Sequence, residues 1–277
     1  MNQFGGDWTQ RKIEIVYDYA KAYLTIMKSY QFKCLYFDGF AGSGNIYNNN
    51  LIDIDIIKGA AIRIIEINDP KSFDIYYFVE LDEANKLQLE ASIKQIAPEK
   101  KTHVVCDDCN NRMIKMADYL KANPLVRTLA FIDPYGMSVK WSSIMSLKDL
   151  GIDLWILVPT GIGINRLLKR NGEISEAWLN KLEEVLGMTA DEIKAYFYKS
   201  TTVQTLFGEE TFVNKEQNAI QKAGELYKKK LNEVFKFVSN PLELKNSTGS
   251  IMYHFMMASN NSAAFKIAND VIKKYKD

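Results

Sequence analysis

The sequence predicts an α/β fold with a mostly parallel central sheet. Five short apolar runs alternate with stretches of helical spacing, and the runs are continuously apolar, as is typical of strands covered on both faces. Each run also ends in a polar or turn-forming residue, and 277 residues with 47% hydrophobic content can bury a full core. The predicted strands are residues 35–37, 73–79, 102–105, 128–132 and 152–158.

Helices are predicted before and between these strands from apolar residues at helical spacing. They cover residues 7–29, 56–67, 82–96 and 110–123. Such a strand–helix alternation is how parallel strands are connected, because each crossover needs a dozen or more residues.

The chain changes its pattern after the fifth strand. Three helices, 174–186, 190–198 and 215–231, predict a helical insertion or cover over residues 165–231. Two apolar runs, 234–238 and 251–257, then flank a turn-rich linker and predict an antiparallel hairpin, and a helix over 263–275 follows. We therefore expect one α/β domain made of residues 1–164 and 232–277, with the helical segment inserted between its two parts.

The charge balance limits the classes of partner. Lys and Arg together number 35 against 34 Asp and Glu, so no global positive field is available to hold nucleic acid, and only a local basic patch could do so. The first residues lack the pattern of a signal peptide, and no apolar run reaches the roughly 18 residues of a membrane span. We expect a cytoplasmic protein without membrane association.

The cysteines do not predict a metal site. Cys106 and Cys109 have C-x-x-C spacing, but zinc needs about four ligands, and Cys34 and the only two histidines, His103 and His254, supply no second pair. We expect ordinary reduced thiols and no bound metal.

The strand ends predict where a ligand binds. The first strand runs into Asp38 and a glycine-rich turn that ends at Gly44, and Glu80 follows the second strand. Asp107, Asp108 and Asp133 follow the next two strands. Because ligands of open parallel sheets bind outside the carboxyl ends of the strands, we expect these acids to line one cleft.

Two common nucleotide sites do not fit the glycine turn. A dinucleotide site needs G-x-G-x-x-G, but Tyr47 occupies the third glycine position, and Glu80 lies far beyond the expected ribose acid about 20 residues downstream. A P-loop is excluded because no Gly-Lys-Ser/Thr sequence follows the turn.

The turn and the predicted topology resemble those of class I S-adenosylmethionine-dependent methyltransferases. Asp38, Phe40, Gly42 and Gly44 match the D-x-F-x-G-x-G turn of enzymes that methylate amino groups. The resemblance implies that this turn binds S-adenosylmethionine and that Glu80 accepts hydrogen bonds from both ribose hydroxyls.

The later strand ends match the same pattern. Asp107 or Asp108 would accept a hydrogen bond from the adenine amino group. Asp133-Pro134-Tyr135 falls where these enzymes carry D/N-P-P-Y/F, although the second proline is absent. The resemblance implies that Asp133 and the Pro134 carbonyl orient the target amine, and that Tyr135 stacks on a planar base.

Two further segments are candidates for binding. Trp8, Thr9 and Lys12 lie at the start of the first helix, which in related enzymes reaches the methionine end of the cofactor, so Lys12 could pair with its carboxylate. Arg166 follows the fifth strand and could contact a phosphate or carboxylate of the substrate.

Several motifs together resemble the three-Cys-motif partner family. They are Phe4-Gly5-Gly6-Asp7-Trp8-Thr9 with Lys12, the turn 38–44, Phe131-Ile132-Asp133-Pro134-Tyr135-Gly136-Met137 and Asn165-Arg166-Leu167-Leu168. We expect an S-adenosylmethionine-dependent methyltransferase that methylates a nitrogen of a nucleobase or nucleoside, either free or in nucleic acid. The alternative that the resemblance implies is an accessory subunit of a three-cysteine protein of the radical S-adenosylmethionine type.

Overall fold

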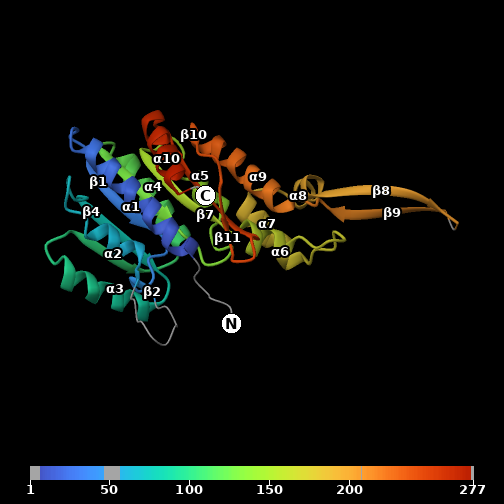
Figure 1. Ribbon diagram of the computed structural model, residues 1–277, viewed down its shortest axis with the longest axis horizontal. Helices are drawn as coiled ribbons and strands as arrows, with labels where there is room; N and C mark the ends of the chain where they lie inside the picture. Colours follow the sequence, from blue (N-terminus) through green and yellow to red (C-terminus); the bar gives the residue numbers. More distant parts are fainter. Residues whose placement is uncertain (1–6, 47–56, 207, 276–277) are drawn as a thin grey trace.

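The centre of the computed structural model, which describes residues 7–46, 57–206 and 208–275, is one twisted sheet (Figure 1). Five of its strands are mutually parallel and lie in the order β5-β4-β1-β6-β7. All five predicted strands are therefore confirmed. Their bounds are Lys33–Asp38 for β1, Ile75–Glu80 for β4, Thr102–Cys106 for β5, Val126–Ile132 for β6 and Ile152–Val158 for β7.

The sheet continues beyond β7 with antiparallel strands. β12 (Ile251–Ser259) runs antiparallel to β7, and both β10 (Phe237–Val238) and β11 (Leu242–Lys245) pair antiparallel with β12. The predicted strand over 234–238 is shorter than expected, because the preceding helix continues to Val234. The predicted Rossmann-like fold, with five parallel strands and an antiparallel end, is confirmed.

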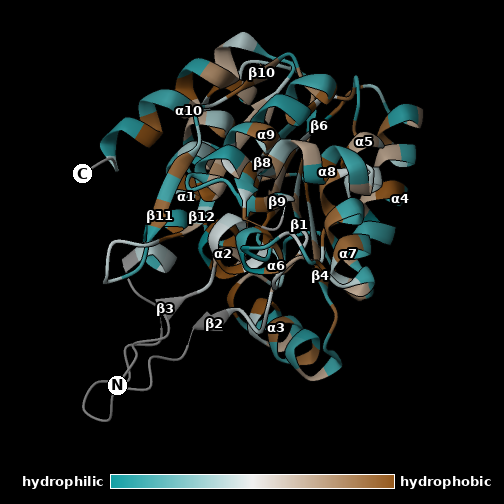
Figure 2. Ribbon diagram, turned by 90° about the vertical axis from the view of Figure 1, so that its right-hand side faces the viewer, coloured by the Kyte–Doolittle hydropathy of each residue, from teal (hydrophilic) through white to brown (hydrophobic). Residues whose placement is uncertain are grey.

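Helices cover both faces of this sheet, as its continuously apolar strands require. On one face lie α1 (Asp7–Met27), α2 (Ala60–Ile65), α3 (Glu83–Ile96) and α10 (Ser262–Lys274). On the other lie α4 (Cys109–Ala122), α5 (Trp141–Met145), α7 (Glu176–Leu186), α8 (Ala190–Phe197) and α9 (Ala219–Val234). Figure 2 shows hydrophobic and hydrophilic residues alternating along these helices, as one-sided packing demands.

The segment after the first glycine turn differs from the prediction. A helix was expected over 56–67, but Ile57–Lys58 forms strand β3, which pairs with β2 (Asn45–Ile46), and α2 begins only at Ala60. Ile57 is β-branched and favours extended backbone, and Gly59 is the N-cap residue at which α2 begins. Residue 56 lies outside the described residues.

The segment 165–231 is not a purely helical insertion. Its last helix, α9, buries Leu226, Tyr227 and Leu231 in the core of the sheet's second face, so it serves as an ordinary covering helix. Between α8 and α9 the chain forms a hairpin of β8 (Tyr198–Thr205) and β9 (Gly208–Lys215), which projects from the body in Figure 1. The threonines and valines of these strands favour extended backbone over helix.

Two short helical elements follow β7. They are the π-helix η1 (Thr160–Ile164) and α6 (Asn165–Leu167). None of the helices in the described ranges is long and apolar enough to cross a membrane.

Candidate functional site

The carboxyl ends of β1 and β6, together with the start of α1, surround a cavity of about 320 Å³. The parallel register places Asp38 beside Phe131, so the turns that follow these two neighbouring strands open into the same space. Eight residues predicted to bind the cofactor or substrate line it: Thr9, Lys12, Asp38, Phe40, Gly42, Gly44, Asp133 and Tyr135.

The glycine turn forms one wall of the cavity, and its backbone conformation requires glycine. Gly42 and Gly44 have φ angles of 62° and 82°, in the left-handed region that side chains disfavour. A Cβ atom on Gly44 would also lie 2.8 Å from Leu89 Cδ1. The amide of Gly59 donates to the Gly44 carbonyl at 2.9 Å, which ties the turn to the start of α2.

Glu80 holds the glycine turn in place. Its carboxylate is 4% exposed and accepts two backbone hydrogen bonds, from the Gly42 amide at 2.8 Å and from the Asp82 amide at 3.0 Å. Each carboxylate oxygen can accept a second hydrogen bond. The geometry therefore gives Glu80 an anchoring role that the sequence did not predict, while its free acceptor positions could still serve a ligand.

Asp38 is buried between charged neighbours. It is 1% exposed, accepts a hydrogen bond from the Phe40 amide at 3.1 Å, and lies 3.4 Å from the Tyr36 hydroxyl. Burial raises the pKa of Asp38 to about 7, and the negative charges of Asp133 and Glu80 add to this increase. Asp38 therefore gains or loses a proton near neutral pH.

Lys12 reaches from α1 to the opposite wall of the cavity. Its ammonium forms an ion pair with Asp133 and lies 5.1 Å from the centre of the Trp8 ring. Lys12 is only 7% exposed, so the pair is largely shielded from water. The sequence predicted both side chains as site residues but not their direct contact, which joins the first helix to the end of β6.

Tyr135 lies at the mouth of the cavity. Its ring is 69% exposed and meets the Phe40 ring edge-on, with 6.3 Å between the ring centres. Its hydroxyl is 3.8 Å from where a Gly42 Cβ would be, so the ring extends over the glycine turn. An exposed aromatic face in this position can stack on a planar ligand.

Six predicted site residues do not line this cavity. Glu80 holds the glycine turn through the Gly42 amide, and the Trp8 ring lies beside the Lys12 ammonium. The other four lie elsewhere. Pro134 is buried and lines a neighbouring crevice instead, and Arg166 is exposed on α6. Asp107 forms an ion pair with Arg112 at 2.7 Å, and Asp108 caps α4 by accepting hydrogen bonds from the amides of the helix's first turn. Both acids follow β5, the edge strand, which lies two strands away from β1.

The cavity also has lining residues that the sequence did not single out. They include Ser43, Gly59 and Asn85. Ser43 lies inside the glycine motif, so its position could have been used to predict it. Gly59 and Asn85 come from the starts of α2 and α3, and nothing in the local sequence distinguishes them from other residues at helix ends.

A metal site does not emerge from the described residues. No group of three or more His, Cys, Asp and Glu side chains among them is arranged to hold a metal ion. Cys109 is buried, which raises the pKa of its thiol far above the usual range, and the exposed Cys106 thiol donates to the Leu81 carbonyl at 3.3 Å.

Comparisons with known proteins find similarity only at the level of structure. No protein-family model matches the chain, and no curated protein matches its sequence. The chain is similar to Trm1 from Pyrococcus horikoshii in complex with S-adenosyl-L-methionine, with 12% identity and a TM-score of 0.40 over 93% of this chain and 64% of the Trm1 chain. The chain thus spans less than two thirds of Trm1.

Two further structures cover most of both chains. For LPL1258 from Legionella pneumophila, identity is 14% and the TM-score is 0.43, over 90% of this chain and 96% of that one. For the plantazolicin methyltransferase BpumL in complex with SAH, identity is 10% and the TM-score is 0.35, over 91% of this chain and 86% of the BpumL chain.

Proposed function

We propose that the protein is an S-adenosylmethionine-dependent methyltransferase that methylates a nitrogen of a nucleobase or nucleoside. The observation that carries this proposal is that the glycine turn, Lys12, Asp133 and Tyr135 line the same cavity. In this proposal the glycine turn binds the methyl donor, and Lys12 pairs with the carboxylate of that donor. Asp133 accepts a hydrogen bond from the target amine, and Tyr135 offers an exposed aromatic ring.

The charge of the cavity supports a cationic ligand. Asp38 and Asp133 line the cavity, and Glu80 accepts a hydrogen bond from the Gly42 amide of its glycine turn. Lys12 is the only cation among the lining residues in the described part of the chain. Such a site repels the phosphates of a dinucleotide or nucleoside triphosphate. It attracts the sulfonium and ammonium groups of S-adenosylmethionine, and Lys12 offers a partner for the one carboxylate of that molecule.

The residues around the cavity suit methyl transfer to an amine. When bound, S-adenosylmethionine supplies an electrophilic methyl carbon, so the protein has mainly to position the nucleophile. Asp133 would accept a hydrogen bond from the target amine and direct the nitrogen lone pair toward the cavity. Tyr135 would stack on the ring that carries the amine.

Calorimetry tests the cofactor. We expect saturable binding of S-adenosylmethionine and of its demethylated product to the full chain. Glu80→Gln should weaken both by about tenfold or more, because hydrogen bonds to a charged group contribute about 1.5–3 kcal/mol. Glu90→Gln, on the exposed side of α3 where Glu90 pairs with Lys86 and Lys94, is the matched control and should not change the affinity. Absence of binding to the wild type would contradict the proposed cofactor.

Transfer of a labelled methyl group tests the reaction. With RNA, DNA and free nucleosides as acceptors, we expect incorporation into one class by the wild type and a loss of about 100-fold or more in Asp133→Ala. Asp133→Asn keeps a hydrogen-bond acceptor and should retain part of the activity. Cofactor binding without transfer to any of these acceptors would contradict nucleobase methylation and favour the accessory-subunit role.

A further inference from the structure

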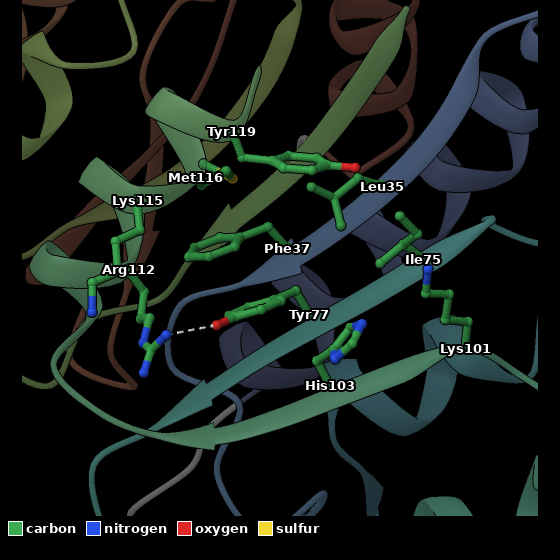
Figure 3. A pocket seen from close by; sticks show the side chains of 10 residues that line it. All are labelled: Leu35, Phe37, Ile75, Tyr77, Lys101, His103, Arg112, Lys115, Met116 and Tyr119. Carbon is green, nitrogen blue, oxygen red and sulfur yellow. Dashed lines mark hydrogen bonds between the residues drawn. The ribbon is translucent and has the colours of Figure 1, made fainter. Parts of the chain in front are cut away.

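A second hollow, of about 280 Å³, lies on the sheet face over β4 and β5 and is named here the aromatic groove (Figure 3). Its floor is a row of rings from three neighbouring strands, because the register aligns Phe37 with Tyr77 and Tyr77 with His103. Phe37 and Tyr77 are stacked at 5.9 Å with 9° between the ring planes, and His103 lies 5.8 Å from Tyr77.

The groove is open because of how α4 crosses the sheet. This helix leads from β5 back to β6 and buries Met113, Met116 and Leu120 in the core, so it leaves the outer part of β4 and β5 uncovered. His103 is exposed, and Tyr119 of α4, on the helix side of the groove, is 41% exposed. Phe37 is only 1% exposed, whereas Tyr77 is half-buried, so a flat molecule could reach the Tyr77 and His103 part of the ring floor from solvent.

Positive charges lie at both ends of the groove. Figure 3 shows Lys101 at one end and Arg112 with Lys115 at the other. None of the ten described residues that line the groove is acidic. Asp107, just outside it, lies 2.7 Å from Arg112 and 3.9 Å from Lys115 and so offsets one of the three charges. The groove is a local basic patch on a chain whose net charge is only +1.

We propose that the aromatic groove binds one unpaired nucleobase of single-stranded nucleic acid, together with its phosphate. Stacking on aromatic rings combined with nearby Lys and Arg is the chemistry by which proteins hold single strands, since every base has a π face and every linkage a negative charge. The volume suits about one base. The site goes beyond the proposed function, because it lies outside the cofactor cavity and its binding requires no methyl donor.

Fluorescence anisotropy with a labelled single-stranded oligonucleotide of mixed sequence tests this, using the full chain without S-adenosylmethionine. RNA and DNA strands are compared, and adenosine monophosphate is added as a competitor to distinguish a free nucleotide from a polymer. We expect binding that weakens with salt, with a slope of about −0.7 for each phosphate contacted. Lys115→Glu and Tyr119→Ala should each weaken binding by about tenfold, the first through charge and the second through stacking.

Each variant has a matched control of the same residue type. Lys121 is also an exposed lysine of α4 beside one aspartate, and Tyr30 is an exposed tyrosine outside the groove, so Lys121→Glu and Tyr30→Ala should bind as the wild type does. Equal losses in groove and control variants would overturn the inference, as would the absence of binding to any of the probes. So would a concentration-dependent dimer that Lys115→Glu disrupts without any nucleotide binding, since the groove would then be a protein interface. Calorimetry with S-adenosylmethionine on the same preparations tests the methyltransferase proposal independently. Loss of cofactor binding would contradict that proposal, whereas loss of oligonucleotide binding would contradict this one.

Discussion

Lys12→Met is expected to lower the free energy of unfolding by about 3 kcal/mol, because it leaves the Asp133 carboxylate without its cation in a largely enclosed site. The Asp133 side chain is 22% exposed and that of Lys12 9%, so water replaces the lost partner only in part. Asp38 is close enough for the charge of Asp133 to raise its pKa, and this repulsion is no longer offset in the variant. Urea unfolding at neutral pH measures the effect.

A double-mutant cycle separates the ion pair from the packing of the lysine chain. Lys12→Met combined with Asp133→Asn removes both charges and should recover much of the loss. Lys273→Met, which breaks an exposed pair on α10 with both side chains 73% exposed, should leave the stability unchanged. Additive effects of the two substitutions in the cavity would show that the pair contributes nothing. In calorimetry, Lys12→Met should also weaken S-adenosylmethionine binding, because the ligand carboxylate loses its proposed partner.

Asp38→Asn is expected to stabilise the ligand-free protein at and above pH 7. The folded state raises the pKa of Asp38 from 3.8 to about 7, so the folded protein keeps a proton that the unfolded chain releases near pH 4. The stability that this group contributes is complete below pH 4 and decreases as the pH rises to about 7. At about 1.4 kcal/mol per pH unit, the loss amounts to at most about 4 kcal/mol. Asparagine keeps an acceptor for the Phe40 amide and has no charge to desolvate.

Unfolding curves recorded between pH 4 and pH 8 check this dependence. The difference in unfolding free energy between Asp38→Asn and wild type should increase with pH and level off above about pH 7. Asp118→Asn, at an exposed carboxylate of α4, is the control and should show no such trend. A difference that does not change with pH would contradict the raised pKa.

The same proton links pH to ligand binding. A cationic cofactor favours the ionised Asp38, so the affinity of the wild type for the cofactor should rise between pH 6 and pH 8, whereas the affinity of Asp38→Asn should stay level.

Much of the fold could be predicted because its strands carry strong local signals. The runs around Phe37, Phe78 and Trp155 are continuously apolar, as only strands buried on both faces are, and their alternation with helices predicts parallel connections. The signals were weaker where propensity and context compete. The hairpin β8–β9 has mostly exposed side chains and therefore no core-facing periodicity, and β3 is too short to be recognised before the helix that follows it.

The positions of candidate site residues could be predicted where the local sequence itself determines them. Asp38 and the glycine turn lie at the end of β1 because the strand ends there, and Lys12 and Thr9 lie on the first turns of α1. The partners of Asp107 and Asp108 could not be predicted in this way: their carboxylates contact Arg112 and the amides of the first turn of α4. Spacing in the sequence does not show which of several nearby donors a carboxylate will accept from.

The sequence by itself determined the succession of the five parallel strands and their connecting helices along the chain, the glycine turn and the set of acids at the strand ends, because apolar periodicity and turn chemistry act over a few residues. Only the tertiary structure decided that Lys12 pairs with Asp133 and that Glu80 accepts a hydrogen bond from the glycine turn. It also decided that no helix in the described residues covers Tyr77 of β4 and His103 of β5 completely. The Lys12–Asp133 ion pair joins residues that are 121 positions apart in the chain, and the hydrogen bond from Gly42 to Glu80 joins residues that are 38 positions apart. Their geometry therefore depends on how whole strands and helices pack.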